Sequence, residues 1–153
     1  MNIEDIRDLY NLGNKAYNKK EFDIAQDFFG SAIDFLEESQ YLDTENGQEL
    51  HSLLLYNLGV TFIKQNKVTD AESLFIKTIK LYSNHSNIYD SRLSQCYFNL
   101  GYIYIYAKRK EINPGLAYIY FSRASMYNTD DAECIDAMKS LIQHANMANI
   151  FKV

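Results

Sequence analysis

A four-residue phrase recurs three times along the chain and constrains its fold more than any other feature. Residues 10–13, 56–59 and 98–101 each consist of an aromatic residue, an asparagine, a leucine and a glycine, in that order. The glycines are 46 and then 42 residues apart. Repetition at a long and nearly constant period is typical of folds that stack one small unit several times. Because two helical stretches follow each other in every period, the sequence predicts three helix–turn–helix units.

Each unit is expected to contain two helices, because apolar residues recur at helical spacing on both sides of a short polar turn. A single proline and six glycines in 153 residues also favour long helices. The expected helices cover about residues 3–19, 22–40, 47–66, 69–82, 88–109 and 114–127. The predicted fold is therefore all-α, a single domain over residues 1–153 with units at about residues 3–40, 47–83 and 88–128.

Polar residues near the expected helix starts support these boundaries. Asn46 with Glu49, and Thr69 with Glu72, have the spacing of a capping box. Asn113 is placed to cap the sixth helix. A seventh helix, at about residues 130–150, carries no repeat phrase. We expect it to cap the array, because the last unit of a stack otherwise leaves an apolar face in water.

Charge and cysteine content exclude several classes of protein. The net charge is −5, with −8 in residues 1–50 and +5 in residues 51–110. This balance and the lack of an arginine-rich run disfavour nucleic acid as a partner. No stretch approaches the roughly 18 apolar residues of a membrane span, and the first residues do not resemble a signal peptide. Cys96 and Cys134 are too few for a disulfide framework. These features predict a cytoplasmic protein that does not bind a membrane.

The repeat positions resemble those of the tetratricopeptide repeat family. In that family, a glycine of the first helix meets an alanine, a bulky residue and a second small residue of the next helix. These positions are filled here by Gly13, Ala25, Phe29 and Ala32; by Gly59, Ala71, Phe75 and Thr78; and by Gly101, Ala117, Phe121 and Ala124, with four extra residues before Ala117. The resemblance implies a right-handed superhelical solenoid. The steps exceed the family's usual 34 residues, as in kinesin light chains and bacterial receptors for signalling peptides.

The resemblance also implies that a peptide or protein segment binds along the concave face, which the first helix of each unit lines. The protein would then act as an adaptor or a chaperone; a bacterial secretion chaperone is similar in length, acidity and repeat number. Matching the groove positions onto this sequence gives ten peptide-binding candidates: Tyr10, Asn11, Asn14, Tyr56, Asn57, Val60, Lys64, Phe98, Asn99 and Tyr102.

Three asparagines of the repeated phrase are the leading candidates among these ten. Stacked units would place Asn11, Asn57 and Asn99 in a row, where each amide offers a donor and an acceptor to an extended peptide. The alternative is that these amides bond between adjacent helices. Packing in the core is the alternative for the aromatic residues, and it is favoured for Tyr17. The carboxylate clamp of chaperone-binding relatives is missing, because Tyr10 and two amides stand where it needs basic residues.

Catalysis has little support in the sequence. The three histidines, His51, His85 and His144, are scattered without a carboxylate or cysteine at a useful spacing, and no glycine-rich phosphate loop is present. We therefore expect no enzymatic activity, no metal and no cofactor. The second interpretation, beside a peptide-binding module, is a structural subunit of a homo- or hetero-oligomeric assembly without a peptide groove.

Overall fold

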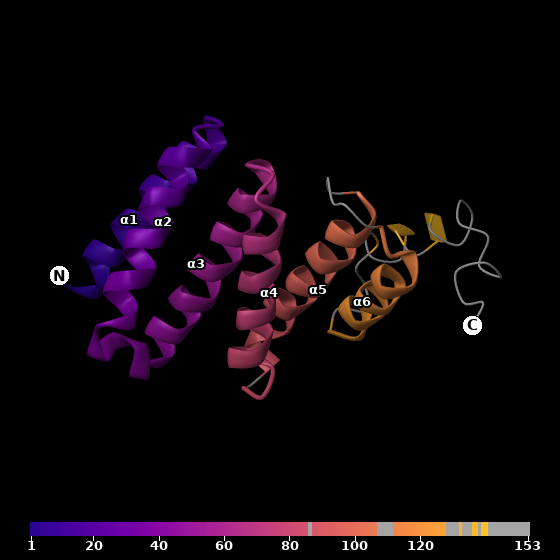
Figure 1. Cartoon of the computed structure of the whole chain (residues 1–153). Coiled ribbons are helices and arrows are strands. Elements are labelled where there is room, and N and C mark those ends of the chain that lie inside the picture. The colour runs from indigo at the N-terminus through magenta and orange to yellow at the C-terminus, as the bar shows by residue number, and fades with distance from the viewer. Residues whose placement is uncertain (86, 107–111, 128–131, 133–135, 138, 141–153) are drawn as a thin grey trace. The chain divides into compact units, whose positions relative to one another are not determined.

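The chain is helical throughout the part that the structure describes. This computed structural model describes residues 1–85, 87–106, 112–127, 132, 136–137 and 139–140. Within those ranges there are six α-helices, two 3-10 segments and no strand (Figure 1). Their bounds are α1 Ile3–Asn18, α2 Phe22–Glu37, η1 Gln40–Asp43, α3 Glu45–Lys64, α4 Val68–Tyr82, η2 Asn87–Tyr89, α5 Asp90–Ile105 and α6 Pro114–Tyr127. The all-α prediction is confirmed for these residues.

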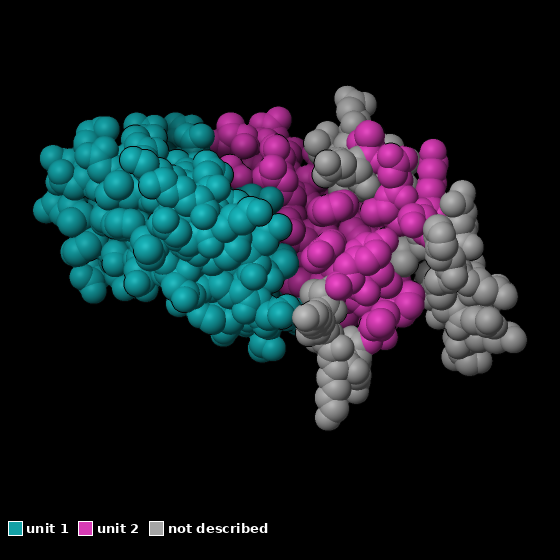
Figure 2. Space-filling view, turned by 90° about the horizontal axis from the view of Figure 1, so that it is seen from above, with its two compact units in different colours: residues 1–78 teal, residues 79–153 magenta. Residues whose placement is uncertain are grey.

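The chain divides into two compact units (Figure 2). Unit 1, residues 1–78, contains α1, α2, η1, α3 and most of α4. Unit 2, residues 79–153, contains the end of α4, then η2, α5 and α6. The prediction of one domain with three stacked units stays a prediction. The expected capping helix, Cys134 and His144 fall wholly or mostly outside the described residues.

The first helix of each hairpin meets the second through the glycine of the repeated phrase. A β-carbon added to Gly59 would lie 2.7 Å from Phe75 Cε1, and one added to Gly101 would lie 2.6 Å from Phe121 Cε1. Gly13 meets Phe29 in the same way. All three phenylalanines are 0% exposed. Only a glycine lets two helices approach this closely without displacing a packed ring.

The other matched repeat positions are buried as well. Ala25, Ala32, Ala71, Thr78, Ala117 and Ala124 are each 0% exposed. Thr78 is larger and more polar than the small residue that the resemblance implies at its position. Its hydroxyl donates a hydrogen bond to the Leu74 carbonyl oxygen at 2.8 Å. Because this bond stays inside α4, the buried hydroxyl is satisfied without a partner from another helix.

Two of the expected caps are wrong, and one is confirmed. Thr44 caps α3, since its Oγ1 accepts from the Gly47 amide at 3.0 Å, so the helix begins before Asn46. α4 already begins at Val68, which places Thr69 inside the helix. Asn113 caps α6 as expected: its Oδ1 accepts from the Leu116 amide at 3.0 Å. α1 has a capping box that the sequence analysis did not identify, between Asn2 and Asp5.

The hairpins of unit 1 turn through the same backbone conformation. Lys20 and Asn66, which are 46 residues apart, have φ angles of 63° and 61°. The next amide in each turn reaches back into the helix that has just ended. Glu21 donates to the Ala16 carbonyl at 3.0 Å, and Lys67 donates to the Phe62 carbonyl at 2.8 Å. These bonds satisfy carbonyl groups that a helix end otherwise leaves unpaired.

Aromatic residues fill much of unit 2. The Tyr97 ring stacks on Tyr127 with centroids 5.7 Å apart, and Tyr104 stacks on Tyr120 at 5.8 Å. At the start of the unit, Tyr82 and Tyr89 stack at 4.7 Å, and both are 3% exposed. Cys96 is a buried free thiol. The many tyrosines therefore contribute packing area between helices as well as surface.

Candidate functional site

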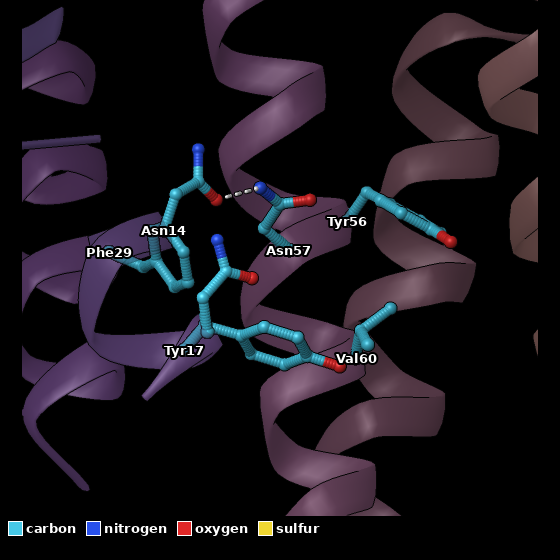
Figure 3. Close-up of a pocket in the computed structure, with 7 residues that line it drawn as sticks. Asn14, Tyr17, Phe29, Tyr56, Asn57 and Val60 are labelled. Atoms are coloured by element: carbon cyan, nitrogen blue, oxygen red, sulfur yellow. Dashed lines mark hydrogen bonds between the residues drawn. The ribbon is translucent and has the colours of Figure 1, made fainter. Parts of the chain in front are cut away.

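A pocket of about 270 Å³ lies in unit 1, where α1, α2 and α3 meet (Figure 3). α1 and α3 contribute three lining residues each, and α2 contributes Phe29. The lining consists of Asn14, Tyr17, Asn18, Phe29, Tyr56, Asn57 and Val60. None of these side chains is charged at neutral pH. The pocket is therefore suited to a neutral group with both apolar surface and hydrogen-bonding atoms.

Two asparagine amides meet at the wall of this pocket. Asn57 Nδ2 donates a hydrogen bond to Asn14 Oδ1 at 3.0 Å, which joins α3 to α1 (Figure 3). The bond uses one donor of Asn57 and one lone pair of Asn14. An amide has two donors and an acceptor oxygen with two lone pairs, so both residues retain unused hydrogen-bonding groups. Asn57 is thus a strut between helices and can still bond a ligand.

Aromatic rings form the apolar part of the pocket. Phe29 is fully buried beneath it and lies 6.3 Å, centroid to centroid, from Tyr10. Tyr17 contacts Phe22 at 5.4 Å, and its ring is directed toward Val60 (Figure 3). Burial raises the pKa of the Tyr17 phenol, so the hydroxyl stays protonated at neutral pH and remains a donor.

The predicted candidates of unit 1 divide into two groups. Asn14, Tyr56, Asn57 and Val60 line the pocket. The other three do not: Tyr10 packs on Phe29, and Asn11 and Lys64 are exposed outside the lining. Three lining residues were missed, namely Tyr17, Asn18 and Phe29. The sequence favours core packing for Tyr17, although this residue follows Tyr10 by seven positions and so shares a face of α1 with it.

The three candidates on α5 belong to unit 2. Phe98 packs on Phe121 with centroids 5.3 Å apart, as Tyr10 packs on Phe29 in unit 1. Asn99 Nδ2 donates to the Gln95 carbonyl of its own helix at 2.8 Å. Tyr102 is 36% exposed and is in ring contact with Tyr106, which is 52% exposed, at 5.4 Å between centroids. The predicted row of Asn11, Asn57 and Asn99 stays a prediction.

His51 has a carboxylate partner, which corrects the sequence analysis. The side chain is 3% exposed, and its Nε2 lies 2.9 Å from Glu37 Oε1. Lys77 Nζ lies 2.8 Å from the same oxygen, so α2, α3 and α4 are joined at one carboxylate. Burial lowers the pKa of His51 and outweighs the opposing effect of Glu37. The imidazole is therefore neutral at pH 7 and donates its Nε2 proton to Glu37.

Burial alone would raise the pKa of Glu37, but hydrogen bonds from Lys77 and His51 lower it. The carboxylate is therefore ionised at neutral pH. His51 and Glu37 are 14 residues apart and on different helices. Only the antiparallel packing of α2 and α3 brings them together. The spacing of histidines and acids along the chain does not show such a pair.

Metal-binding clusters and membrane-spanning helices are absent from the described residues. No group of three or more histidine, cysteine, aspartate or glutamate side chains lies close enough to hold a metal ion there. None of the helices in that part of the chain combines the length and the apolar character needed to cross a bilayer.

The comparisons with known proteins add no relative to this picture. No protein-family model matches the sequence, and comparison with the curated proteins finds no significant match. The fold and the site therefore define only a class: an all-helical protein with glycine-mediated helix pairs and a neutral pocket lined by amides and tyrosines. A more specific function has to be argued from the geometry and chemistry of the pocket residues.

Proposed function

We propose that the chain is a protein-interaction module of the tetratricopeptide type, which binds an extended segment of another protein along α1 and α3 of unit 1. The observation that carries the proposal is the pocket formed by the Asn14–Asn57 pair and the rings of Tyr17 and Tyr56. Adaptor and chaperone roles, including a secretion chaperone or a signalling-peptide receptor, are all compatible with this binding mode.

The composition of the pocket limits what it can bind. A volume of about 270 Å³ is slightly below the roughly 300–1,000 Å³ of small-molecule pockets, so it suits one part of a larger ligand. The free amide groups match the donor and acceptor of a peptide backbone. The rings and Val60 suit an uncharged side chain of that peptide. Since no basic residue lines the pocket, capture of a terminal carboxylate is disfavoured.

The proposal is tested by screening a random peptide library against the purified chain and titrating the best peptide. Val60→Trp should fill the pocket and weaken binding at least about tenfold, because the ligand's anchor is displaced. Asn57→Ala should weaken binding about 5- to 150-fold, since the peptide's backbone groups lose their partner. Asn46→Ala is the matched control, because Asn46 is an exposed asparagine of the same helix, α3, and lies outside the pocket.

Thermal melts separate binding from folding in this experiment. If Asn57→Ala lowers the melting temperature by many degrees while the remaining folded protein binds normally, Asn57 acts only as a strut to Asn14. If Val60→Trp and Asn46→Ala bind the peptide equally well, the pocket is not the binding site.

The second candidate is a structural subunit of an assembly, and exposed apolar residues of α6 favour it. Ile119 and Met126 are 44% and 77% exposed and lie seven residues apart, on one face of the helix. Sedimentation equilibrium distinguishes the two functions. An obligate oligomer that dissociates with Met126→Asp would favour the assembly subunit, and a monomer would favour the peptide-binding module.

A further inference from the structure

The α1–α2 hairpin of unit 1 has an apolar outer face that is separate from the pocket. Leu12, Ile24 and Phe35 are 44%, 47% and 43% exposed. Leu12 is on α1, and the other two are on α2. Large apolar side chains that gather on one exposed face often mark an interaction surface.

Their position on that face follows from the hydrogen bonds of nearby residues. Asn14, Gln26 and Glu37 each bond to the later part of unit 1: Asn14 to Asn57, Gln26 to Gln65, and Glu37 to His51. Each of the three exposed apolar residues stands two positions before one of them. Two positions are a rotation of about 200° around a helix. The three apolar side chains therefore point away from α3.

We name Leu12, Ile24 and Phe35 the outer apolar face. Acidic residues border it, because residues three or four positions apart are neighbours on a helix. Asp8 is four positions before Leu12, Asp27 is three after Ile24, and Glu38 is three after Phe35. All three carboxylates are exposed. On the basic side, Lys15 follows Leu12 by three positions, at the end of α1 that is far from Phe35.

The end of the outer apolar face near Phe35 also places negative charge where a helix disfavours it. The last turn of α2 contains Asp34 and Glu37, followed by Glu38 at the C-cap, and no basic residue. Carboxylates at a helix C-terminus are destabilised by the partial negative charge of the unpaired carbonyl groups. Lys77 compensates the charge of Glu37, and the neutral His51 donates a hydrogen bond to it. Within the described part of unit 1, Asp34 and Glu38 have no ion pair of their own.

We propose that the outer apolar face docks an amphipathic helix of a partner protein whose lysine or arginine residues lie over Phe35, Asp34 and Glu38. The apolar side of that helix covers Leu12, Ile24 and Phe35. Its basic end supplies the positive charge that the C-terminus of α2 lacks. This surface is distinct from the pocket, so the chain can hold two partners or two parts of one partner at once.

The probe is a pair of synthetic amphipathic peptides of about sixteen residues, or four to five helical turns. Both carry a leucine stripe; one has lysines at one end of its polar face, and the other has glutamates there. Fluorescence anisotropy with the full chain should show the lysine peptide binding at least about tenfold more tightly than the glutamate peptide. The affinity for the lysine peptide should fall as salt is raised.

Variants then locate the binding. Phe35→Ser should weaken binding of the lysine peptide at least about tenfold, because the peptide loses the aromatic side chain that it would cover in the complex. Leu81→Ser is the matched control, since Leu81 is 42% exposed and belongs to unit 2. Asp34→Asn with Glu38→Gln keeps the side-chain shapes and should reduce both the affinity and its salt dependence. Ile24→Ser repeats the test should Phe35→Ser fail to fold.

Three results would overturn the proposal. Equal binding of the lysine peptide to wild type, Phe35→Ser and Ile24→Ser would place the contact elsewhere. Preference for the glutamate peptide would contradict the charge argument. Dimerisation of the wild type that Phe35→Ser abolishes would show that a second copy of the chain covers this face. Val60→Trp should leave the lysine peptide's affinity unchanged, so failure of the pocket and failure of this surface are separate outcomes.

Discussion

Replacing two glycines by alanine should shift stability in opposite directions. Gly59 and Gly30 are both helical, but their surroundings differ. A β-carbon at Gly59 would lie 2.7 Å from Phe75 Cε1 and 2.9 Å from Phe75 Cζ, whereas one at Gly30 would meet nothing within 4 Å. Carbon atoms in contact prefer separations of about 3.5–4.0 Å. The Phe75 ring would have to retreat by roughly 0.8 Å or more, although it is 0% exposed and packed against Tyr56.

The magnitude follows from two opposing terms. Alanine in a helix interior gains about 0.8–1 kcal/mol over glycine. Overpacking a filled core costs about 1–3 kcal/mol. Gly59→Ala should therefore destabilise the chain by up to about 2 kcal/mol. Gly30→Ala should stabilise it by about 0.8–1 kcal/mol, since only the first term applies.

Urea denaturation followed by circular dichroism measures both variants. At about 2–4 °C per kcal/mol for a chain of this length, thermal melts should also separate them. Adding Phe75→Leu to Gly59→Ala should recover part of the loss, because a smaller side chain removes the clash, and a double-mutant cycle isolates that coupling. If both alanine variants shift the midpoint in the same direction by similar amounts, Gly59 is not a close-contact position and the repeated phrase loses its structural meaning.

Three further substitutions test local features. Lys20→Gly should stabilise the chain by about 1 kcal/mol in urea denaturation, because Lys20 holds a left-handed conformation that a side chain disfavours. Gly47→Ala should cost more than Gly59→Ala in the same assay, because its β-carbon would overlap the backbone carbonyl oxygen of Tyr41. The free energy of unfolding should fall as pH drops below about 6.5, the ordinary pKa of His51, because the unfolded chain then binds a proton that the folded chain resists. His51→Gln should flatten that decline, and the further decline below about pH 4.5, where the lowered pKa of Glu37 matters, should remain.

The helix pairs were predictable because their signals are local and repeated. Each glycine of the phrase meets a phenylalanine of the same helix pair. The same order of glycine, alanine and phenylalanine in three helix pairs therefore supports the prediction of each one. The helix starts were harder to predict. Thr44 and Asn46 are both good capping residues within three positions, and the choice depends on how η1 places the chain. Sequence spacing does not contain that information.

The candidate site was predictable only in part, because it depends on how neighbouring helices align. Asn57 and Asn11 occupy equivalent positions in the repeated phrase. Asn57 nevertheless forms its hydrogen bond with Asn14, which lies about one helical turn beyond Asn11 on α1. The same alignment moves Tyr17 from the expected core to the pocket. The contact between His51 and Glu37 likewise depends on the packing of two helices. Such offsets between helices are tertiary properties, and a single-sequence pattern does not determine them.

The glycine–phenylalanine contacts also bear on how the chain folds. Gly13 and Phe29 are 16 residues apart, as are Gly59 and Phe75, and Gly101 and Phe121 are 20 apart. Closing a loop of 20 residues costs only about 0.2 kcal/mol more than closing one of 16. The four extra residues of the third pair therefore carry almost no entropic penalty. Because every such contact is local in sequence, each hairpin can nucleate without waiting for another, and the low contact order favours rapid folding.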